Sequence, residues 1–213
     1  MEGKRFSLAM VPVRLRSSGR LLVMVFASVV LLTQAACLTS KSYVDPELKK
    51  VVLQDLEQRE NPAPIYLIVE FQTNGKPNLR ATNQVFDQVT ATLRSTGMFT
   101  EVRSAASDDA ATMQIVMNNV ADMGSAVGKG IGTGLTLGLA GSMVTDGYVF
   151  TATFTAPGME PVIKEYKHAI HTTIGNKRGP QGLTPVPIGQ AFDQVVRDLV
   201  LNLLEDLQTE GHL

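Results

Sequence analysis

The alternation of apolar and polar residues in YVFTATFTA, Tyr148 to Ala156, constrains the fold of this 213-residue chain more than any other feature. Successive side chains of a β-strand point to opposite faces of the sheet, so this segment has one apolar face and one threonine-rich face. The turn sequence APGME follows, and PVIKEYKHAIHTTI returns as a partner strand. The pair predicts an antiparallel hairpin whose apolar face needs a covering layer. That face holds Tyr148, Phe150, Ala152, Phe154, Val162, Tyr166, His168 and Ile170.

Two amphipathic segments can supply the covering layer. From Asn78 to about Ser95 apolar residues recur at helical spacing, and Gly97 follows where a C-terminal cap belongs. A second helix is expected from about Ile188 to Leu207, with a broad apolar face.

The two predicted helices share a sequence motif. NQVFDQVTATL, which begins at Asn83, and GQAFDQVVRDL, which begins at Gly189, agree at six of eleven positions with an offset of 106 residues. Either an ancient duplication or similar packing on similar strands explains the agreement. In both cases we expect Phe86 and Phe192 to be equivalent core anchors. The paired acids Asp87 and Asp193 should then lie away from the sheet.

Three further segments read as strands: IYLIVEF from Ile65, MFTEVRS from Met98, and ATMQIVMNNVAD from Ala111. The order is therefore strand, helix, strand, strand, glycine segment, strand, strand, helix. This order predicts an α+β fold, with a mixed or antiparallel sheet of about four to five strands and two helices packed on one face. We assign residues 65–207 to this single domain, with a glycine-rich insertion at residues 124–145.

The first 36 residues read as an export signal instead of part of the fold. A positively charged start precedes an apolar core of 12 residues, Leu21 to Leu32, which is shorter than the roughly 20 residues that span a bilayer. The sequence TQAAC then ends at Cys37, the only cysteine in the chain. This resembles a bacterial lipobox, although Gln34 stands where a small aliphatic residue is usual.

The lipobox resemblance implies that Cys37 carries a lipid and becomes the first residue of the mature protein. Leu38 replaces the aspartate that retains such proteins at the inner membrane, so the resemblance implies an outer-membrane location on the periplasmic face. Two alternatives stay open. Cleavage after Ala35 would give a soluble periplasmic protein, and an uncleaved signal would anchor the chain in the inner membrane.

Residues 37–64 read as the lipidated N-terminus and a tether. Asp45 suits a helix N-cap and Pro46 the first helical position, and apolar residues from Leu48 to Leu56 form a stripe. PAP at residues 62–64 ends the segment. We expect a spacer helix that lies on the domain, in preference to a helix that docks a partner.

The charge balance excludes one class of partner. From Cys37 onward the chain has 14 basic and 19 acidic residues, a net charge of −5. Nucleic-acid binding requires clustered lysine and arginine, so we exclude it.

The glycine-rich stretch GSAVGKGIGTGLTLGLAGSMV begins at Gly124. Its spacing fails the phosphate-binding loop, because Gly130 follows Lys129 where serine or threonine is required. It also fails the dinucleotide fingerprint, because Thr133 takes the place of the third glycine. We therefore expect no nucleotide and no other cofactor.

The same glycines repeat at four-residue spacing, which on a helix lines up small residues for close backbone packing. This resembles the glycine zippers of bacterial envelope proteins and implies a membrane or oligomer contact. The uncharged run is 16 residues, about 24 Å as a helix and short of a span of about 30 Å. The alternative is a flexible connection between strands. The zipper residues are Gly124, Gly128, Gly130, Gly132, Gly134 and Gly138.

Residues that carry chemistry are sparse. His168 and His171 lie three apart in a strand, so their rings should point to opposite faces and cannot share a metal ion. Asp122 and Asp146 flank the glycine stretch without a partner base. We therefore expect neither a metal site nor a catalytic residue.

The element order and the phrase TGMFTEV after a helix resemble the small α/β domains of envelope lipoproteins of the YajG type. They are similar, more loosely, to lipoprotein domains of curli secretion and penicillin-binding-protein activation. The resemblance implies a non-enzymatic lipoprotein that faces the periplasm, attached to the membrane through its lipid, and that binds an envelope protein or itself. The alternatives are a membrane-inserting oligomeric transport or secretion component, and a periplasmic enzyme.

Overall fold

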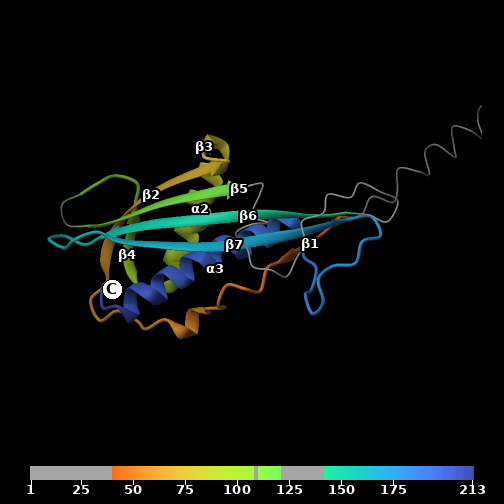
Figure 1. The fold of residues 1–213 in the computed structure, drawn as a ribbon. Coiled ribbons are helices and arrows are strands. Elements are labelled where there is room, and N and C mark those ends of the chain that lie inside the picture. Colours follow the sequence, from red (N-terminus) through yellow and green to blue (C-terminus); the bar gives the residue numbers. More distant parts are fainter. Residues whose placement is uncertain (1–39, 108–109, 121–141) are drawn as a thin grey trace, which may run out of the picture. The chain divides into compact units, whose positions relative to one another are not determined.

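The computed structural model describes residues 40–107, 110–120 and 142–213, and within them seven strands form one mixed sheet (Figure 1). The order across the sheet is β1-β7-β6-β5-β2-β3, and β4 pairs with β2 beside this path. The strands are β1 (Ser40–Val44), β2 (Ala63–Thr73), β3 (Lys76–Pro77), β4 (Phe99–Arg103), β5 (Ala111–Val120), β6 (Ser142–Thr155) and β7 (Val162–Ile174).

The centre of the sheet follows the predicted pattern. β6 and β7 form the antiparallel hairpin, with Phe150 opposite Tyr166. β5 lies antiparallel to β6 and parallel to β2, so the sheet is mixed. It has more strands than the four to five expected because two short ones join its edges. One of these, β1, comes from the segment that we read as a tether.

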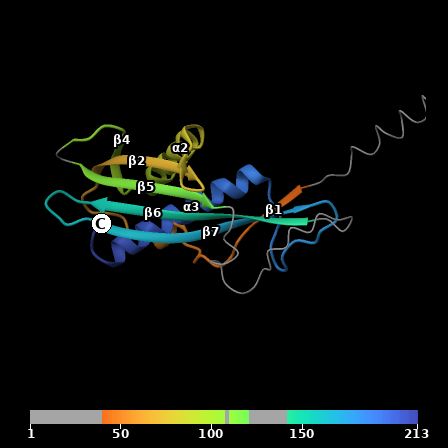
Figure 2. The same cartoon turned by 45° about the horizontal axis from the view of Figure 1, so that its top comes forward.

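Two helices, α2 (Leu79–Thr96) and α3 (Ile188–Thr209), pack on the sheet (Figure 2). The Asn78 side chain caps α2 by accepting a hydrogen bond from the Ala81 N–H, at 3.2 Å. Gly97 ends the helix in the left-handed conformation, at φ 68°, which glycine adopts without a steric penalty. The α+β class with two covering helices is thus confirmed.

The core lies between the helices and the alternating apolar face of the central strands. Tyr148, Phe150, Ala152 and Phe154 are buried there, whereas the intervening residues of β6 are only half-buried. The fully buried large side chains of β2, β5 and β6 are Ile65, Leu67, Met113, Ile115, Met117 and Phe150. Every residue of this core lies in the unit Thr39–Leu213.

The shared helix motif has the predicted orientation. Phe86 and Phe192 are both half-buried against the core, and Asp87 and Asp193 are exposed. The Phe192 ring lies 6.2 Å from the ring of Phe71 and 5.6 Å from that of Tyr148, measured between centroids. Phe192 thus connects α3 to both β2 and β6.

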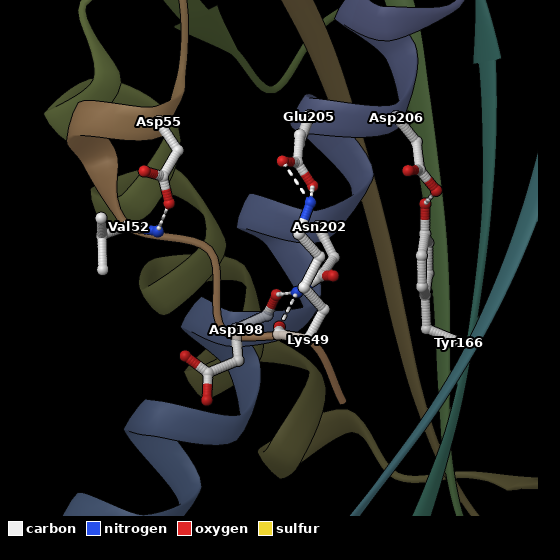
Figure 3. A network of polar contacts seen from close by, with 8 residues as sticks. All are labelled: Lys49, Val52, Asp55, Tyr166, Asp198, Asn202, Glu205 and Asp206. Atoms are coloured by element: carbon white, nitrogen blue, oxygen red, sulfur yellow. Dashed lines mark hydrogen bonds and ion pairs between the residues drawn. The ribbon is translucent and has the colours of Figure 1, made fainter. Parts of the chain in front are cut away.

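The predicted tether helix after Asp45 is wrong, because the structure has only a short 3₁₀ turn there, η2 (Leu53–Asp55). Contacts with α3 decide the conformation. The Asn202 amide of α3 donates to the Lys49 carbonyl oxygen at 2.9 Å, which takes an acceptor that a helix would use (Figure 3). Val51 and Leu56 are buried in the core. Burial of these two side chains outweighs the local helical preference.

No helix of residues 40–107, 110–120 and 142–213 has the length and apolar character needed to cross a membrane.

Candidate functional site

The predicted lipidation site and zipper residues lie outside the described residues. Cys37 and the zipper glycines from Gly124 to Gly138 belong to residues 1–39 and 121–141. The structure instead describes where the flanking chain enters the sheet. The last four residues assigned to the glycine-rich insertion, 142–145, begin strand β6.

Ser40, Ile174 and Ser142 occupy one row across three neighbouring strands. Ser40 pairs with Ile174, and Ile174 pairs with Ser142. Neighbouring strands lie about 4.8 Å apart, so the first residue of β1 and the first residue of β6 are about 10 Å apart. The chain after Cys37 and the chain after the glycine segment therefore enter the sheet at the same end.

Among residues 40–107, 110–120 and 142–213, fewer strands reach this end of the sheet than cross its centre. Val120, the last residue of β5, pairs with Gly147, so β6 continues for five residues beyond β5. Those residues, together with β1 and residues 170–174 of β7, make up what we call the three-stranded extension (Figure 1).

A buried polar chain crosses the extension. His171 Nε2 lies 2.9 Å from Asp45 Oδ2, and His171 Nδ1 lies 2.9 Å from Thr145 Oγ1. An ionised carboxylate only accepts, so Nε2 donates to Asp45, and in a neutral imidazole Nδ1 then accepts from the Thr145 hydroxyl. The His171 residue is 1% exposed. These hydrogen-bonded side chains connect β6 and β7 to Asp45, the residue after β1.

The electrostatics favour the ionised form of Asp45. Burial acts to raise the pKa of this carboxyl, but the hydrogen bond from His171 and the 2.8 Å bond from the Glu47 N–H outweigh burial and lower the pKa below its usual value. The order acid, imidazole, hydroxyl matches that of hydrolytic triads. Here all three groups are engaged between strands of one sheet, so we interpret the chain as a structural tie.

The two histidines of the HAIH segment point to opposite faces, as predicted. His168 is buried on the helical side, where its Nε2 lies 3.5 Å from Asp198 Oδ2 of α3. His171 faces Asp45 on the other side. Among the described residues no group of three histidine, cysteine or acidic side chains could hold a metal ion.

A groove of about 880 Å³ lies between α2, α3 and residues 50–54. Its rim is polar, with the glutamines at positions 88, 190 and 194 near Asp193 and Arg197. The Gln88 amide donates to Asp193 Oδ1, which leaves Gln88 Oε1 buried without a partner among the described residues. Amide and carboxylate groups on an apolar floor can bind a polar ligand or a partner segment.

Sequence reasoning missed this groove because it depends on how the two helices pair. The shared motif carried the available signal, since Gln88 and Gln194 occupy equivalent positions of the two copies. Asp193 is likewise the counterpart of Asp87. The motif predicts only that Asp87 and Asp193 lie away from the sheet; the contact of Asp193 with Gln88 arises from the packing of α2 on α3.

A second polar cluster holds α3 in place (Figure 3). Tyr166 of β7 donates to Asp206 Oδ2 at 2.5 Å, and the Lys49 ammonium lies 2.6 Å from Glu205 Oε1. Burial, followed by the bond to Asp206, raises the pKa of Tyr166. The tyrosine therefore stays protonated, and its role is to position the helix.

No family model matches the chain, and no curated protein matches its sequence. Among solved structures, the domain is similar to a neuraminyllactose-binding hemagglutinin homolog from Helicobacter pylori, with 11% identity and a TM-score of 0.38 over 71% of this chain and 88% of that one. Rare lipoprotein B from Shewanella oneidensis has 9% identity and a TM-score of 0.34, over 68% and 92%. PelC from Paraburkholderia phytofirmans, a dodecamer, has 12% identity and a TM-score of 0.29, over 80% of this chain and 98% of that one.

The domain thus shows a low-identity structural similarity to bacterial lipoproteins. At these scores the likeness is one of general fold.

Proposed function

We propose that this chain is a non-enzymatic lipoprotein of the outer membrane, anchored through Cys37, whose domain faces the periplasm and binds another envelope component. The observation that carries the proposal is the start of the sheet at Ser40, three residues after Cys37. Three extended residues reach at most about 10 Å. A lipid on Cys37 would therefore hold the three-stranded extension close to the membrane surface, without a spacer.

Labelling with a fatty-acid analogue tests the anchor. We expect the wild-type protein to take up the label and Cys37→Ala to lose it, and the variant to leave the membrane fraction. Leu38→Asp serves as the sorting control, because the label should persist while the protein moves to the inner membrane. Label retained on Cys37→Ala would refute lipidation.

The groove between α2 and α3 supports the binding role. A photo-crosslinking residue at Gln190, on the groove rim, should capture a partner in intact envelopes. The matched control is Gln114, which is exposed on the sheet face opposite the core. Asp193→Lys and Arg197→Glu should abolish the Gln190 product, because they reverse the charges on the rim. Equal products from Gln190 and Gln114 would argue against the groove.

A second candidate function is a membrane-inserting oligomeric component that uses the zipper glycines. The row Ser40, Ile174, Ser142 favours it, because the chain leaving the glycine segment enters the sheet beside the chain leaving Cys37. The unlipidated Cys37→Ser protein should then self-associate or require detergent. Leucine at positions 128, 132 and 134 should abolish this behaviour, and a detergent-independent monomer would refute it.

A further inference from the structure

Three exposed cations gather at the end of the three-stranded extension. Lys41 is the second residue of β1, next to Ser40. Lys177 and Arg178 follow the last residue of β7, Ile174, by three and four positions. Lys41 pairs with Thr173. All three cations therefore lie within four residues of the row formed by Ser40, Ile174 and Ser142.

The loop that carries two of these cations is fixed against β1. A Cβ added at Gly179 would lie 2.2 Å from Tyr43 Cζ, so the loop backbone rests directly on the buried tyrosine ring. Further along, the Val186 N–H donates to the Ser42 carbonyl oxygen at 2.9 Å. The loop therefore leaves the sheet after β7 and returns beside β1 (Figure 1). Lys177 and Arg178 lie in the part of the loop between Ile174, where β7 ends, and Gly179, which contacts Tyr43.

The charge at this end is opposite to that of the chain as a whole. Residues 40–44, 142–146 and 170–187 contain three lysine and arginine residues and one acid, the half-buried Asp146, which lies opposite Ile170 at the inner limit of the extension. The chain from Cys37 onward carries a net charge of −5. A domain that is acidic overall thus presents a cationic surface at the end from which the chain continues to Cys37.

We propose that Lys41, Lys177 and Arg178 form a docking surface for the anionic phospholipid headgroups of the membrane that holds the anchor. The orientation rests on the proposed lipid at Cys37, whose covalent reach brings this end within about 10 Å of the bilayer. Each lysine or arginine near an anionic surface strengthens binding roughly fivefold, and the effect falls off within a Debye length of about 8 Å. A lipid and a cationic patch together fix which way the domain faces, which a flexible lipid alone does not.

Vesicle sedimentation of the unlipidated Cys37→Ser protein, residues 37–213, tests this surface separately from the anchor. We expect binding to vesicles of phosphatidylethanolamine with phosphatidylglycerol, and much weaker binding to vesicles of phosphatidylcholine alone. Lys41→Gln, Lys177→Gln and Arg178→Gln together should weaken binding to the anionic vesicles up to roughly 100-fold. About 0.5 M salt should have a similar effect.

The matched control neutralises three exposed cations elsewhere, by Lys76→Gln, Arg94→Gln and Lys167→Gln. It changes the net charge equally and should leave vesicle binding intact. Any of three results would overturn the docking surface. The control variant could lose as much binding as the first triple variant, the first triple variant could bind as well as the wild type, or the wild type could fail to bind the anionic vesicles. Binding that is independent of lipid charge would instead indicate apolar insertion and would also overturn it. Failure of lipidation is read separately, from the fatty-acid label on Cys37.

Discussion

Asp45 shows how one carboxylate can replace a predicted local role with a long-range one. The sequence favours it as a helix N-cap, and it does accept from the Glu47 N–H. Its other oxygen, however, accepts from His171, 126 positions along the chain. That second bond fixes the chain after β1 to β7, and the segment that follows continues along α3 instead of forming a helix.

We expect Asp45→Asn to lower the free energy of unfolding by about 2 kcal/mol at pH 7, because it removes a charge-assisted hydrogen bond to buried His171. Folding lowers the pKa of Asp45. The stabilisation of the folded state by the ionised Asp45 carboxylate is therefore complete above the pKa of about 3.9 that aspartate has in the unfolded chain. It is lost as the pH falls through the lower pKa of the folded state. Urea unfolding at several pH values should show the difference between wild type and variant shrinking below about pH 4. Exposed Asp87→Asn is the control, and a difference independent of pH would contradict this account.

Gly179 supports a second prediction at this scale. Gly179→Ala should lower the stability by about 2 kcal/mol, because its Cβ would overlap the Tyr43 ring. Gly189→Ala meets no atom within 4 Å and should be neutral or slightly stabilising. Tyr43→Ala should relieve most of the added cost in a double-mutant cycle measured by thermal unfolding. Additive losses would show that the ring and the glycine do not interact.

At the level of elements, periodicity was enough wherever one face of a strand or helix is buried. The hairpin of β6 and β7, the strands β2 and β5, and both long helices were predicted in type and order. The parallel pairing of β2 with β5 was not predicted and is known only from the structure. Strand β1 was missed, because the five residues SKSYV have no clear alternation of apolar and polar side chains. They form a strand by pairing with β7. Such short edge strands depend on their neighbour more than on their own sequence.

The two copies of the helix motif provide a test of equivalence. Phe192→Ala should cost about 3 kcal/mol, because this ring packs on Phe71 and Tyr148. Phe86→Ala should cost about 1 kcal/mol less, since the aromatic contacts add about that much beyond burial. Equal losses in chemical unfolding would show that the two phenylalanines are energetically equivalent anchors.

For the molecule as a whole, the three-stranded extension should open separately from the main core. Of the residues of the extension only Ile170 and Val44 contact the hydrophobic core, and polar contacts supply much of the rest, whereas the centre of the sheet packs on both helices. In Asp45→Asn, hydrogen exchange should become faster in β1 and in residues 170–174, while the amides of β5 keep their protection. Uniformly faster exchange would instead show that the tie contributes only to global stability.

The sequence by itself determined the α+β class, the order of the main elements and the buried face of the central strands, because local periodicity records which side of an element avoids water. It also nominated Cys37 and the zipper glycines, which remain predictions. Only the tertiary structure decided that the segment after Asp45 is not a helix, and that the motif glutamines line a groove. It alone placed Ser40, Ser142 and the three cations at one end of the sheet. The first two features arise from contacts between residues more than 100 positions apart, Lys49 with Asn202 and Gln88 with Asp193, and the third arises from strand pairing; local sequence does not encode the energies of such contacts.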